Sequence, residues 1–300
     1  MEARVKLDKL ALSARGKGQT YYRYQDGLPN YHYDGFFNPN IDTVEDRTVL
    51  KYENIVKFQH AESGNRLIVC NKRIKNAPNA SPLYLIFYTD YDQKISYRDA
   101  YTVSKHFHQF HVSLRVSQIH LATDLISEQR MDLYHSVIRA IKPGFKRKPS
   151  KIYDTSVYFG KAVSSNALIV YDKLVELANE KGIHLPGDVC RVETRLKPPK
   201  LFNFVQTIED LAVQDWSFVF PKYFSFHQLK PDLKKGMESI GIECRKPIWD
   251  LRDIMEERFG IIPSNFYRDY LMDHPLFSDP VREALSDYRW CRNYKQSQSL

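Results

Sequence analysis

Cysteine is scarce in this chain, which holds four cysteines in 300 residues and no CxxC pair. This spacing excludes a disulfide framework and a zinc ribbon, and it favours a reducing compartment. Long apolar runs are also absent: none approaches the roughly 18 residues of a membrane-spanning helix, and the start, MEARVK, lacks the apolar core of a signal peptide. We therefore expect a protein with no membrane partner that stays in the cytoplasm of the cell that makes it.

The charge is unbalanced toward the basic side. The 44 Lys and Arg residues outnumber 36 Asp and Glu, which gives a formal net charge of +8 and favours a polyanionic partner. The composition, with 43% hydrophobic and 27% charged residues, is that of a globular protein and excludes wholesale disorder. Tyrosine is abundant, with 20 copies, so a single tyrosine is weak evidence for a functional role by itself.

The first part of the chain predicts strands followed by a helix. Residues 4–14 alternate apolar and polar side chains, which is the period of a half-buried strand. Short apolar runs at 66–70 and 83–88, separated by a turn-rich segment, predict an antiparallel pair. Residues 97–114 contain no Gly or Pro and show helical periodicity, which predicts a helix.

The middle of the chain, over 116–197, has the clearest pattern: strand, helix, strand, strand, helix, strand. The predicted strands are 116–125, 155–160, 166–172 and 189–196, and the predicted helices run from an N-cap at Ser127 through Ile141 and over 173–181. Ferredoxin-like folds use this order as their split βαββαβ unit. In that unit the first and third strands are central neighbours and the fourth flanks the first, so we expect 116–125 to lie between 166–172 and 189–196.

The predicted fold class is therefore α+β: an antiparallel sheet with a ferredoxin-like βαββαβ core, N-terminal strands before it and a C-terminal helical appendage after it. We expect one domain over 1–215, with its core at 116–197, and a helical region over 216–300. The second region is charged and interrupted by prolines, and the sequence does not state its role.

Polar residues from distant parts of the chain are expected to meet on one face of this sheet. Alternate side chains of a strand share a face, and the amphipathic helices must cover the opposite face. The residues that this arrangement collects are His120, Asp124, Tyr171, Lys173, Arg191, Glu193 and Arg195.

A tyrosine beside carboxylates and an imidazole is suited to attack on a phosphodiester. Such ligands can hold a divalent cation that polarises the phosphate, and the phenol oxygen can then attack to leave a phosphotyrosine. Lys173 and the arginines can stabilise the negative charge. Other interpretations stay open: Tyr171 can pack at a sheet edge, and Asp124 can pair with Arg191 or Arg195. His120 can equally be a histidine hydrogen-bonded on the sheet.

Three motifs in this region resemble the rolling-circle replication initiation factor family, which includes plasmid initiators and replication-associated endonucleases of filamentous phages. Members resemble one another in a hairpin strand that ends in tyrosine, an acidic residue and lysine, here 171–173, often with a glutamate three positions on, here Glu176. An Arg, apolar, Glu strand follows at 191–193, and IHLATD occupies the position of an upstream acidic strand. The likeness covers roughly residues 5–215.

The resemblance implies a nuclease with Tyr171 as its nucleophile. Tyr171 would nick one strand at an origin, become linked to the 5′ end, leave a 3′ hydroxyl as primer and later rejoin the strand. Asp124 and Glu193 match the metal-binding acidic positions, with Mg²⁺ or Mn²⁺ as the expected ion. His120 departs from the family pattern, in which aspartate is common, and an imidazole there would favour a softer ion than Mg²⁺.

The resemblance also implies partners and a location. The expected partners are double-stranded and single-stranded origin DNA together with a host helicase and polymerase, and a homodimer is compatible with the family. The expected location is the cytoplasm of a bacterium or of a phage-infected host cell.

A basic stretch over 139–153 carries six basic residues and no acidic one. Its Gly and two Pro residues forbid a continuous helix, so we expect an exposed loop. Beside a nuclease sheet such a loop is suited to DNA phosphates, with salt-dependent binding. The residues expected to contact DNA are Lys146, Arg147, Lys148 and Lys151 from this stretch, together with Arg191 and Arg195.

Two rival hypotheses remain. The chain could be a non-catalytic binder of single-stranded nucleic acid, with exposed aromatics stacking on bases, although the RRM aromatic signature is absent. It could also be a relaxase or transposase of the class with a His-hydrophobic-His motif, because His106, Phe107 and His108 spell that motif. The motif requires a strand, whereas this segment predicts a helix, in which residues two apart diverge by about 200°.

Overall fold

The computed structural model describes residues 1–14, 36–37, 49–77, 79–89, 93–109, 111–145, 148–161 and 164–291, apart from the side chain of Lys72. The described chain forms two compact units. The first unit holds Met1–Val5, Ala122–Thr194 and Asp215–Tyr288, and the second holds Lys6–Leu121, Arg195–Gln214 and the residues from Arg289. The region after residue 215 thus shares a compact unit with most of the predicted core.

The second unit is built on an antiparallel sheet with the strand order β2-β3-β4-β5-β1-β6. The strands are β1 (Glu2–Ala14), β2 (Phe36–Phe37), β3 (Tyr52–His60), β4 (Arg66–Arg73), β5 (Leu83–Tyr88) and β6 (Leu114–Ser127). β1 and β6 are divided between the two units. Apolar side chains of neighbouring strands, such as Ala11, Ile68 and Ile86, form its buried core, as expected when one sheet face is covered.

The strands predicted at 4–14, 66–70 and 83–88 are confirmed, and the last two pair antiparallel, with Val69 opposite Leu85. The sequence reasoning missed β3. Its sequence, YENIVKFQH, interrupts the β-forming residues with polar ones, so it lacks a clean apolar run or alternation. Pairing with β4 along its length stabilises it as a strand.

The helix predicted over 97–114 is confirmed only as far as His108, where α1 (Tyr97–His108) ends. The predicted end is wrong, because His111 has a φ of 62°, which breaks a right-handed helix, and β6 already begins at Leu114. Ser96 caps α1, because its side chain accepts a hydrogen bond from the backbone N–H of Asp99. α1 buries Val103 and Phe107. A short second helix, α4 (Ile208–Val213), begins at a capping box formed by Thr207 and Asp210.

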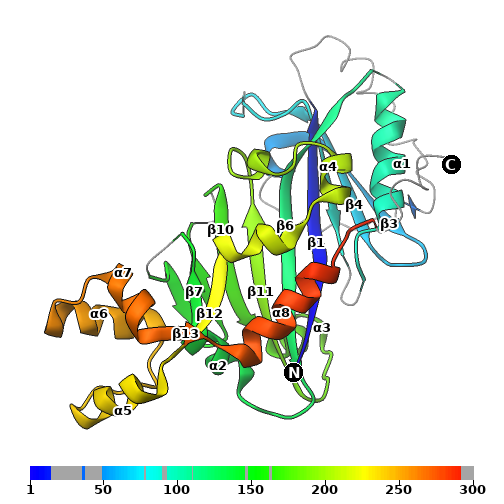
Figure 1. The fold of residues 1–300 in the computed structure, drawn as a ribbon. Coiled ribbons are helices and arrows are strands. Elements are labelled where there is room, and N and C mark those ends of the chain that lie inside the picture. The colour runs from blue at the N-terminus through cyan, green and yellow to red at the C-terminus, as the bar shows by residue number, and fades with distance from the viewer. Residues whose placement is uncertain are drawn as a thin grey trace. The chain divides into compact units, whose positions relative to one another are not determined.

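The first unit contains the strands and helices of the predicted motif in their predicted order along the chain, and its sheet has the strand order β6-β11-β10-β9-β8. In chain order its elements after β6 are α2 (Leu133–Ala140), β7 (Ile141–Pro143), β8 (Lys151–Tyr153), β9 (Ser156–Phe159), β10 (Asn166–Asp172), α3 (Lys173–Lys181) and β11 (Asp188–Leu196). β6, β11 and β10 lie side by side (Figure 1). The hairpin of β9 and β10, helix α3 and strand β11 fall where the sequence predicts them, and Gly182 ends α3 in the left-handed conformation that suits glycine.

The predicted strand order is wrong. The ferredoxin-like order places the strand of Asp124 between the other two, whereas the structure places β11, the strand of Glu193, between β6 and β10. The reason is visible on the polar face. Arg191 finds its partner on β6 and Glu193 finds its partner on β10, which requires β11 to have a neighbour on each side.

The helix predicted from Ser127 through Ile141 is also wrong at both ends. β6 continues to Ser127, and α2 spans only Leu133–Ala140. Ile141–Pro143 forms β7, which pairs antiparallel with Phe224–Phe226 of β12, so tertiary pairing overrides the helical periodicity there. The predicted basic loop is therefore interrupted by two strands, β7 and β8.

The C-terminal part of the first unit is not only helical, because it carries a small sheet with the order β13-β12-β7. Its elements are β12 (Phe224–Leu229), α5 (Pro231–Ser239), α6 (Ile248–Phe259), α7 (Pro263–Asn265), β13 (Leu271–Asp273) and α8 (Pro275–Asp287). α5, α6 and α7 gather beyond β13 (Figure 1), where Met237, Leu251 and Phe266 share a buried apolar cluster. None of the helices in the described ranges is long and apolar enough to cross a membrane.

Candidate active site

Tyr171 lies at the end of β10, where the strand passes directly into helix α3. Asp172 makes this junction without a loop, because its carboxylate accepts hydrogen bonds of 3.0 Å from the backbone N–H groups of Leu174 and Val175. An N-cap of this kind satisfies backbone donors that a helix start would leave unpaired. The phenol of Tyr171 is thus carried on a backbone that is fixed by the sheet on one side and by a capped helix on the other.

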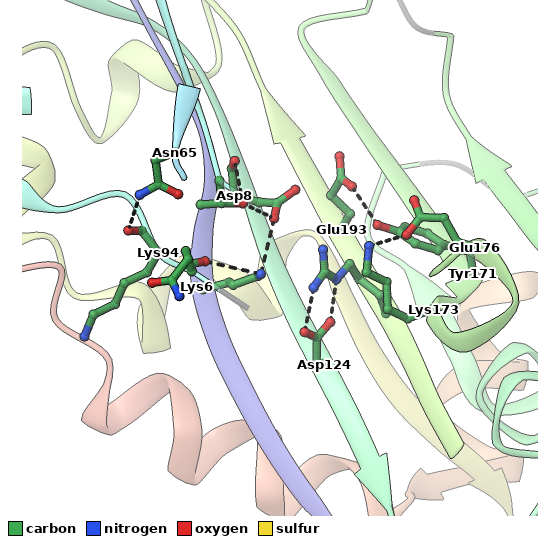
Figure 2. Close-up of polar contacts among 12 residues, drawn as sticks. Lys6, Asp8, Asn65, Lys94, Asp124, Tyr171, Lys173, Glu176 and Glu193 are labelled. Carbon is green, nitrogen blue, oxygen red and sulfur yellow. Dashed lines mark hydrogen bonds and ion pairs between the residues drawn. The ribbon is translucent and has the colours of Figure 1, made fainter. Parts of the chain in front are cut away.

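The phenol of Tyr171 points at the carboxylate of Glu193 on the neighbouring strand, as Figure 2 shows. Its Oη donates a hydrogen bond to Glu193 Oε2 at 3.4 Å. Both side chains are buried, with exposed fractions of 9% for Tyr171 and 3% for Glu193. The structure therefore brings together the predicted nucleophile and one predicted acidic residue, although they are 22 positions apart in the chain.

Arg191 and Asp124 form a two-pronged ion pair on the same sheet face. Arg191 Nε lies 2.5 Å from Asp124 Oδ1, and its terminal nitrogen lies 2.7 Å from Asp124 Oδ2 (Figure 2). Arg191 is 3% exposed, so this pair is largely withdrawn from water. A bidentate pair of this kind is strong because both partners are charged and the geometry is fixed. The ion-pair interpretation of Asp124 is thus confirmed.

Lys173 and Glu176 form an ion pair in the first turn of α3. The ammonium of Lys173 also lies over the ring of Tyr171, 5.7 Å from its centre. Burial raises the pKa of the Glu176 carboxyl, and the hydrogen bond from Lys173 offsets this only in part. The ammonium of Lys173 is therefore held beside the phenol by its ion pair with Glu176.

His120 is buried on β6, where its Nε2 lies within hydrogen-bonding distance of the side-chain nitrogen of Gln118. Because the amide nitrogen can only donate, the imidazole accepts at Nε2. This contact agrees with the interpretation of His120 as a histidine that is hydrogen-bonded on the sheet.

No protein-family model and no curated protein matches this chain. Among solved structures, the chain is similar to a rolling circle replication initiator protein from Geobacillus stearothermophilus. The two chains are 11% identical, and the match covers 76% of this chain and 88% of the other with a TM-score of 0.45. The likeness is distant and concerns the fold alone.

The three predicted metal ligands are of a suitable kind but are engaged with protein partners. Carboxylate oxygens suit Mg²⁺, and imidazole with carboxylate suits Mn²⁺. In the structure, Asp124 binds Arg191, Glu193 accepts from Tyr171, and His120 accepts from Gln118. Among the residues that the structure describes, no group of three or more His, Cys, Asp or Glu side chains is arranged to hold a metal ion. The metal site stays a prediction.

The residues expected to contact DNA are scattered. Arg191 is buried against Asp124, and Arg195 is half-buried. Lys148 pairs with Asp253, whereas Lys151 is exposed on β8. Lys146 and Arg147 lie outside the described residues. Contact with DNA stays a prediction for all six.

The paired-histidine motif lies on α1, so His106 and His108 point in different directions around a helix. The strand geometry that this motif requires is absent from this segment. Burial lowers the pKa of His106, which favours its neutral form. The structure thus removes the geometric basis of the hypothesis of a relaxase or transposase of that class.

Two tyrosines of the site face were missed by the sequence reasoning, namely Tyr153 on β8 and Tyr158 on β9. Both lie on the strands that lead outward from Tyr171 to the edge of the first unit's sheet. The sequence does indicate that these side chains share a face, because Lys151 and Tyr153, and then Ser156 and Tyr158, are each two positions apart, which is the period of a strand. The Pro and basic residues before Lys151 indicated a loop instead, so this pattern was overlooked.

Proposed function

We propose that this chain initiates rolling-circle DNA replication by nicking one strand of an origin with Tyr171 and later rejoining it. The contact that supports this proposal most directly is the hydrogen bond from the Tyr171 phenol to Glu193. It places a carboxylate, which can accept a proton, on the hydroxyl that the sequence motif singles out as the nucleophile.

The first step is attack of the phenol oxygen on the scissile phosphorus. As the Oη–P bond forms, the phenol proton passes to Glu193, and the bond from phosphorus to the 3′ oxygen breaks. The 3′ oxygen takes up a proton from water and becomes the primer hydroxyl, while the 5′ phosphate stays on Tyr171. A phenol is a much weaker acid than a carboxylic acid, so proton transfer must accompany the attack and not precede it.

Lys173 is suited to neutralise the charge that develops on the phosphate. Its ammonium already lies beside the Tyr171 ring, and it is held there by Glu176. A DNA phosphate can compete with Glu176 for this ammonium, because the phosphate is charged and burial raises the pKa of the Glu176 carboxyl. Entry of DNA would therefore exchange the Lys173–Glu176 pair for a Lys173–phosphate pair and open access to the buried phenol.

Rejoining reverses the first step. A 3′ hydroxyl gives up its proton to water as its oxygen attacks the phosphorus of the phosphotyrosine, the P–Oη bond breaks, and Glu193 returns the proton to the phenolate. The proposal further includes a host helicase and polymerase that use the 3′ primer, action in the cytoplasm of a bacterium or of a phage-infected host cell, and a homodimer as one form of the initiator.

Divalent-cation dependence is part of the proposal. A bound Mg²⁺ or Mn²⁺ would polarise the scissile phosphate, with Asp124, Glu193 and His120 as the residues that would hold it. Because each of these side chains has a protein partner in the structure, no step above passes through the ion.

The direct test uses supercoiled DNA that carries the gene and its candidate origin, incubated with Mg²⁺, Mn²⁺ or a chelator. We expect the parent protein to give a nick and a covalent 5′ adduct only with the metal. Tyr171→Phe should give neither product while still binding the DNA, because only the nucleophilic oxygen is lost. The matched control is Tyr84→Phe, which alters another buried tyrosine in the second unit and should still nick.

An unchanged nicking rate in Tyr171→Phe would exclude this tyrosine as the nucleophile. Binding of DNA by the parent protein without any nick or adduct would instead favour the non-catalytic binder. Cleavage that persists with the chelator would remove the metal from the proposal and leave the tyrosine chemistry in place.

A further inference from the structure

Strand β8 forms the outer edge of the first unit's sheet, and its three residues, Lys151–Tyr153, are all exposed. Tyr153 is 52% exposed, although it lies on a strand. An aromatic side chain on an open sheet edge leaves apolar surface in water and invites unwanted association, so proteins usually avoid it. Its presence on β8 is explained if a partner covers this ring.

The register of three strands places Tyr153 on the same face as Tyr171. Tyr153 pairs with Ser156 of β9, and Ser156 pairs with Tyr171 of β10. Residues directly opposite each other in antiparallel strands share a face of the sheet. The next row repeats the arrangement, because Lys151 pairs with Tyr158 and Tyr158 pairs with Ile169.

The two tyrosines are close enough to serve one ligand. Neighbouring strands lie about 4.8 Å apart, so the backbone at Tyr153 is roughly 10 Å from that at Tyr171. The turn between β8 and β9 is also tied to the nucleophile's strand, because the N–H of Asp172 donates to the carbonyl of Thr155 at 3.0 Å. A polymer whose phosphate reached Tyr171 would therefore pass over β9 and β8.

The edge is held in place at both ends, and with only three residues β8 offers few backbone groups to a further strand. Ser150 Oγ donates to the carbonyls of Tyr158 at 3.0 Å and Gly160 at 2.8 Å, which fixes the start of β8. The Tyr134 hydroxyl donates to the carbonyl of Tyr153 at 3.3 Å, which fixes the end of β8. A ligand recognised through side chains thus fits the edge better than a peptide recognised through backbone hydrogen bonds.

The side chains themselves match a single-stranded nucleic acid. The rings of Tyr153 and Tyr158 meet edge to face, with centres 5.8 Å apart, which leaves ring surface available for stacking. Lys151 makes no ion pair within the described part of the chain, whereas Lys148 is already paired with Asp253. β8 itself holds no acidic residue, and the acidic residue nearest to Tyr153 in the sequence is Asp154, in the turn that follows. Aromatic rings beside a free ammonium are the usual means of binding bases and phosphates of a single strand.

We infer that Lys151, Tyr153 and Tyr158 form a ledge, here the β8–β9 ledge, that binds single-stranded DNA beside the scissile phosphate. Tyr153 and Tyr158 stack on bases, and Lys151 contacts a backbone phosphate. The inference rests on the proposed function, since it places the ledge next to the proposed nucleophile, but it concerns binding and not cleavage.

The test measures the affinity of Tyr171→Phe protein for a fluorescently labelled single-stranded oligonucleotide of about 12 nucleotides, a length typical of such sites. Adding Tyr153→Ala and Tyr158→Ala together should weaken binding by about tenfold or more, because stacking on one base is worth roughly 1–3 kcal/mol. Tyr153→Phe should keep the affinity, since the ring is retained, and Tyr153→Leu should lose it. An oligonucleotide without bases should bind equally to the Tyr171→Phe protein with and without the two alanine substitutions.

The matched control is Phe218→Ala, which removes an exposed aromatic side chain that lies outside β8 and β9. It should leave the affinity unchanged. Equal loss with Phe218→Ala and with the ledge variant, or no loss with the ledge variant, would overturn the inference. Loss of self-association in the ledge variant with unchanged DNA affinity would also overturn it and identify the edge as a protein interface. Because all binding is measured in protein without the Tyr171 hydroxyl, these outcomes do not depend on whether Tyr171 nicks DNA.

Discussion

Tyr171 and Tyr153 stand in one row of one sheet face, two strands apart, and their surroundings are opposite. Tyr171 is buried, donates a hydrogen bond to Glu193 and lies beside the ammonium of Lys173. Tyr153 is half exposed, and its ring contacts only Tyr158 among the aromatic side chains of the described chain. The two positions thus differ in the way that our proposals require, with Tyr171 as a nucleophile and Tyr153 as a residue that contacts bases.

The comparison shows what each task requires of its surroundings. A nucleophile gains from fixed partners and exclusion of water, because electrostatic interactions are stronger there. A binding residue gains from exposure, because it must replace water by the ligand. Abundance of tyrosine says nothing about either role, whereas position in the row does.

The largest expected effect is a loss of stability when the ion pair on the sheet face of Tyr171 is broken. Arg191→Met should lower the free energy of unfolding by about 3 kcal/mol, because it leaves the largely buried charge of Asp124 without its partner. Lys151→Met, on the exposed strand β8, should change the free energy of unfolding by no more than about 0.5 kcal/mol. Urea unfolding followed by circular dichroism measures both. The double change Asp124→Leu with Arg191→Met should recover most of the loss, and failure to recover it would mean that the pair is not what stabilises this face.

A somewhat smaller effect is expected on the chemistry alone. Glu193→Gln should slow single-turnover nicking by roughly 10²–10³-fold, because the amide can still accept the hydrogen bond from Tyr171 but cannot take its proton. The affinity for single-stranded DNA, which we attribute to the β8–β9 ledge, should stay within about twofold of the affinity of the parent protein. A nicking rate equal to that of the parent protein would exclude Glu193 as the base. If the affinity for DNA fell as much as the nicking rate, the Tyr171–Glu193 site and the β8–β9 ledge would not have separate tasks.

The smallest expected effect is a change in the pH dependence of stability, caused by Glu176 beside Tyr171. Burial raises the pKa of the Glu176 carboxyl in the folded chain. Such a group stabilises the fold fully at pH values below the ordinary glutamate pKa of about 4.3, and this contribution is lost as the pH rises through the folded-state pKa. Glu176→Gln cannot titrate, so its stability relative to the parent should improve as the pH rises from about 4 to about 7. If the free energies of unfolding of the parent and of Glu176→Gln differed by the same amount at every pH in this range, the expectation would be wrong.

Much of the first unit could be predicted from local pattern. Alternation defined β6 and β11, and the change from an apolar strand over 166–172 to a helical run over 173–181 placed the junction at Asp172. These features depend on residues a few positions apart, which the sequence displays directly. The same is true of α1, because its helical period by itself indicates that His106 and His108 do not share a face.

The lateral order of the strands could not be predicted in the same way, because it depends on which distant side chains meet. The likeness to a split βαββαβ unit supplied one order, and the partners of Arg191 and Glu193 on opposite sides of β11 required another. The helix ends near Ser127 and Ile141 failed for a related reason, since β12, a strand more than eighty residues later in the chain, pairs with Ile141–Pro143.

The candidate site itself was predicted as a set of residue types and not as a set of contacts. Tyr171, Glu193 and Lys173 lie together as expected, whereas the sequence left open whether Asp124 holds a metal or pairs with Arg191 or Arg195, and the structure pairs it with Arg191. Ion-pair geometry depends on side-chain length and on register, and neither follows from the strand pattern alone.

The loop-free junction at Tyr171, Asp172 and Lys173 has a consequence for the time after cleavage. A DNA end joined to Tyr171 would be attached to a strand whose next residue already caps a helix, so the attachment point could not swing away from the sheet. The captured end would keep its position and direction while the other end is extended over a full round of replication. When the new junction returns, the phosphotyrosine would still be where the cut was made.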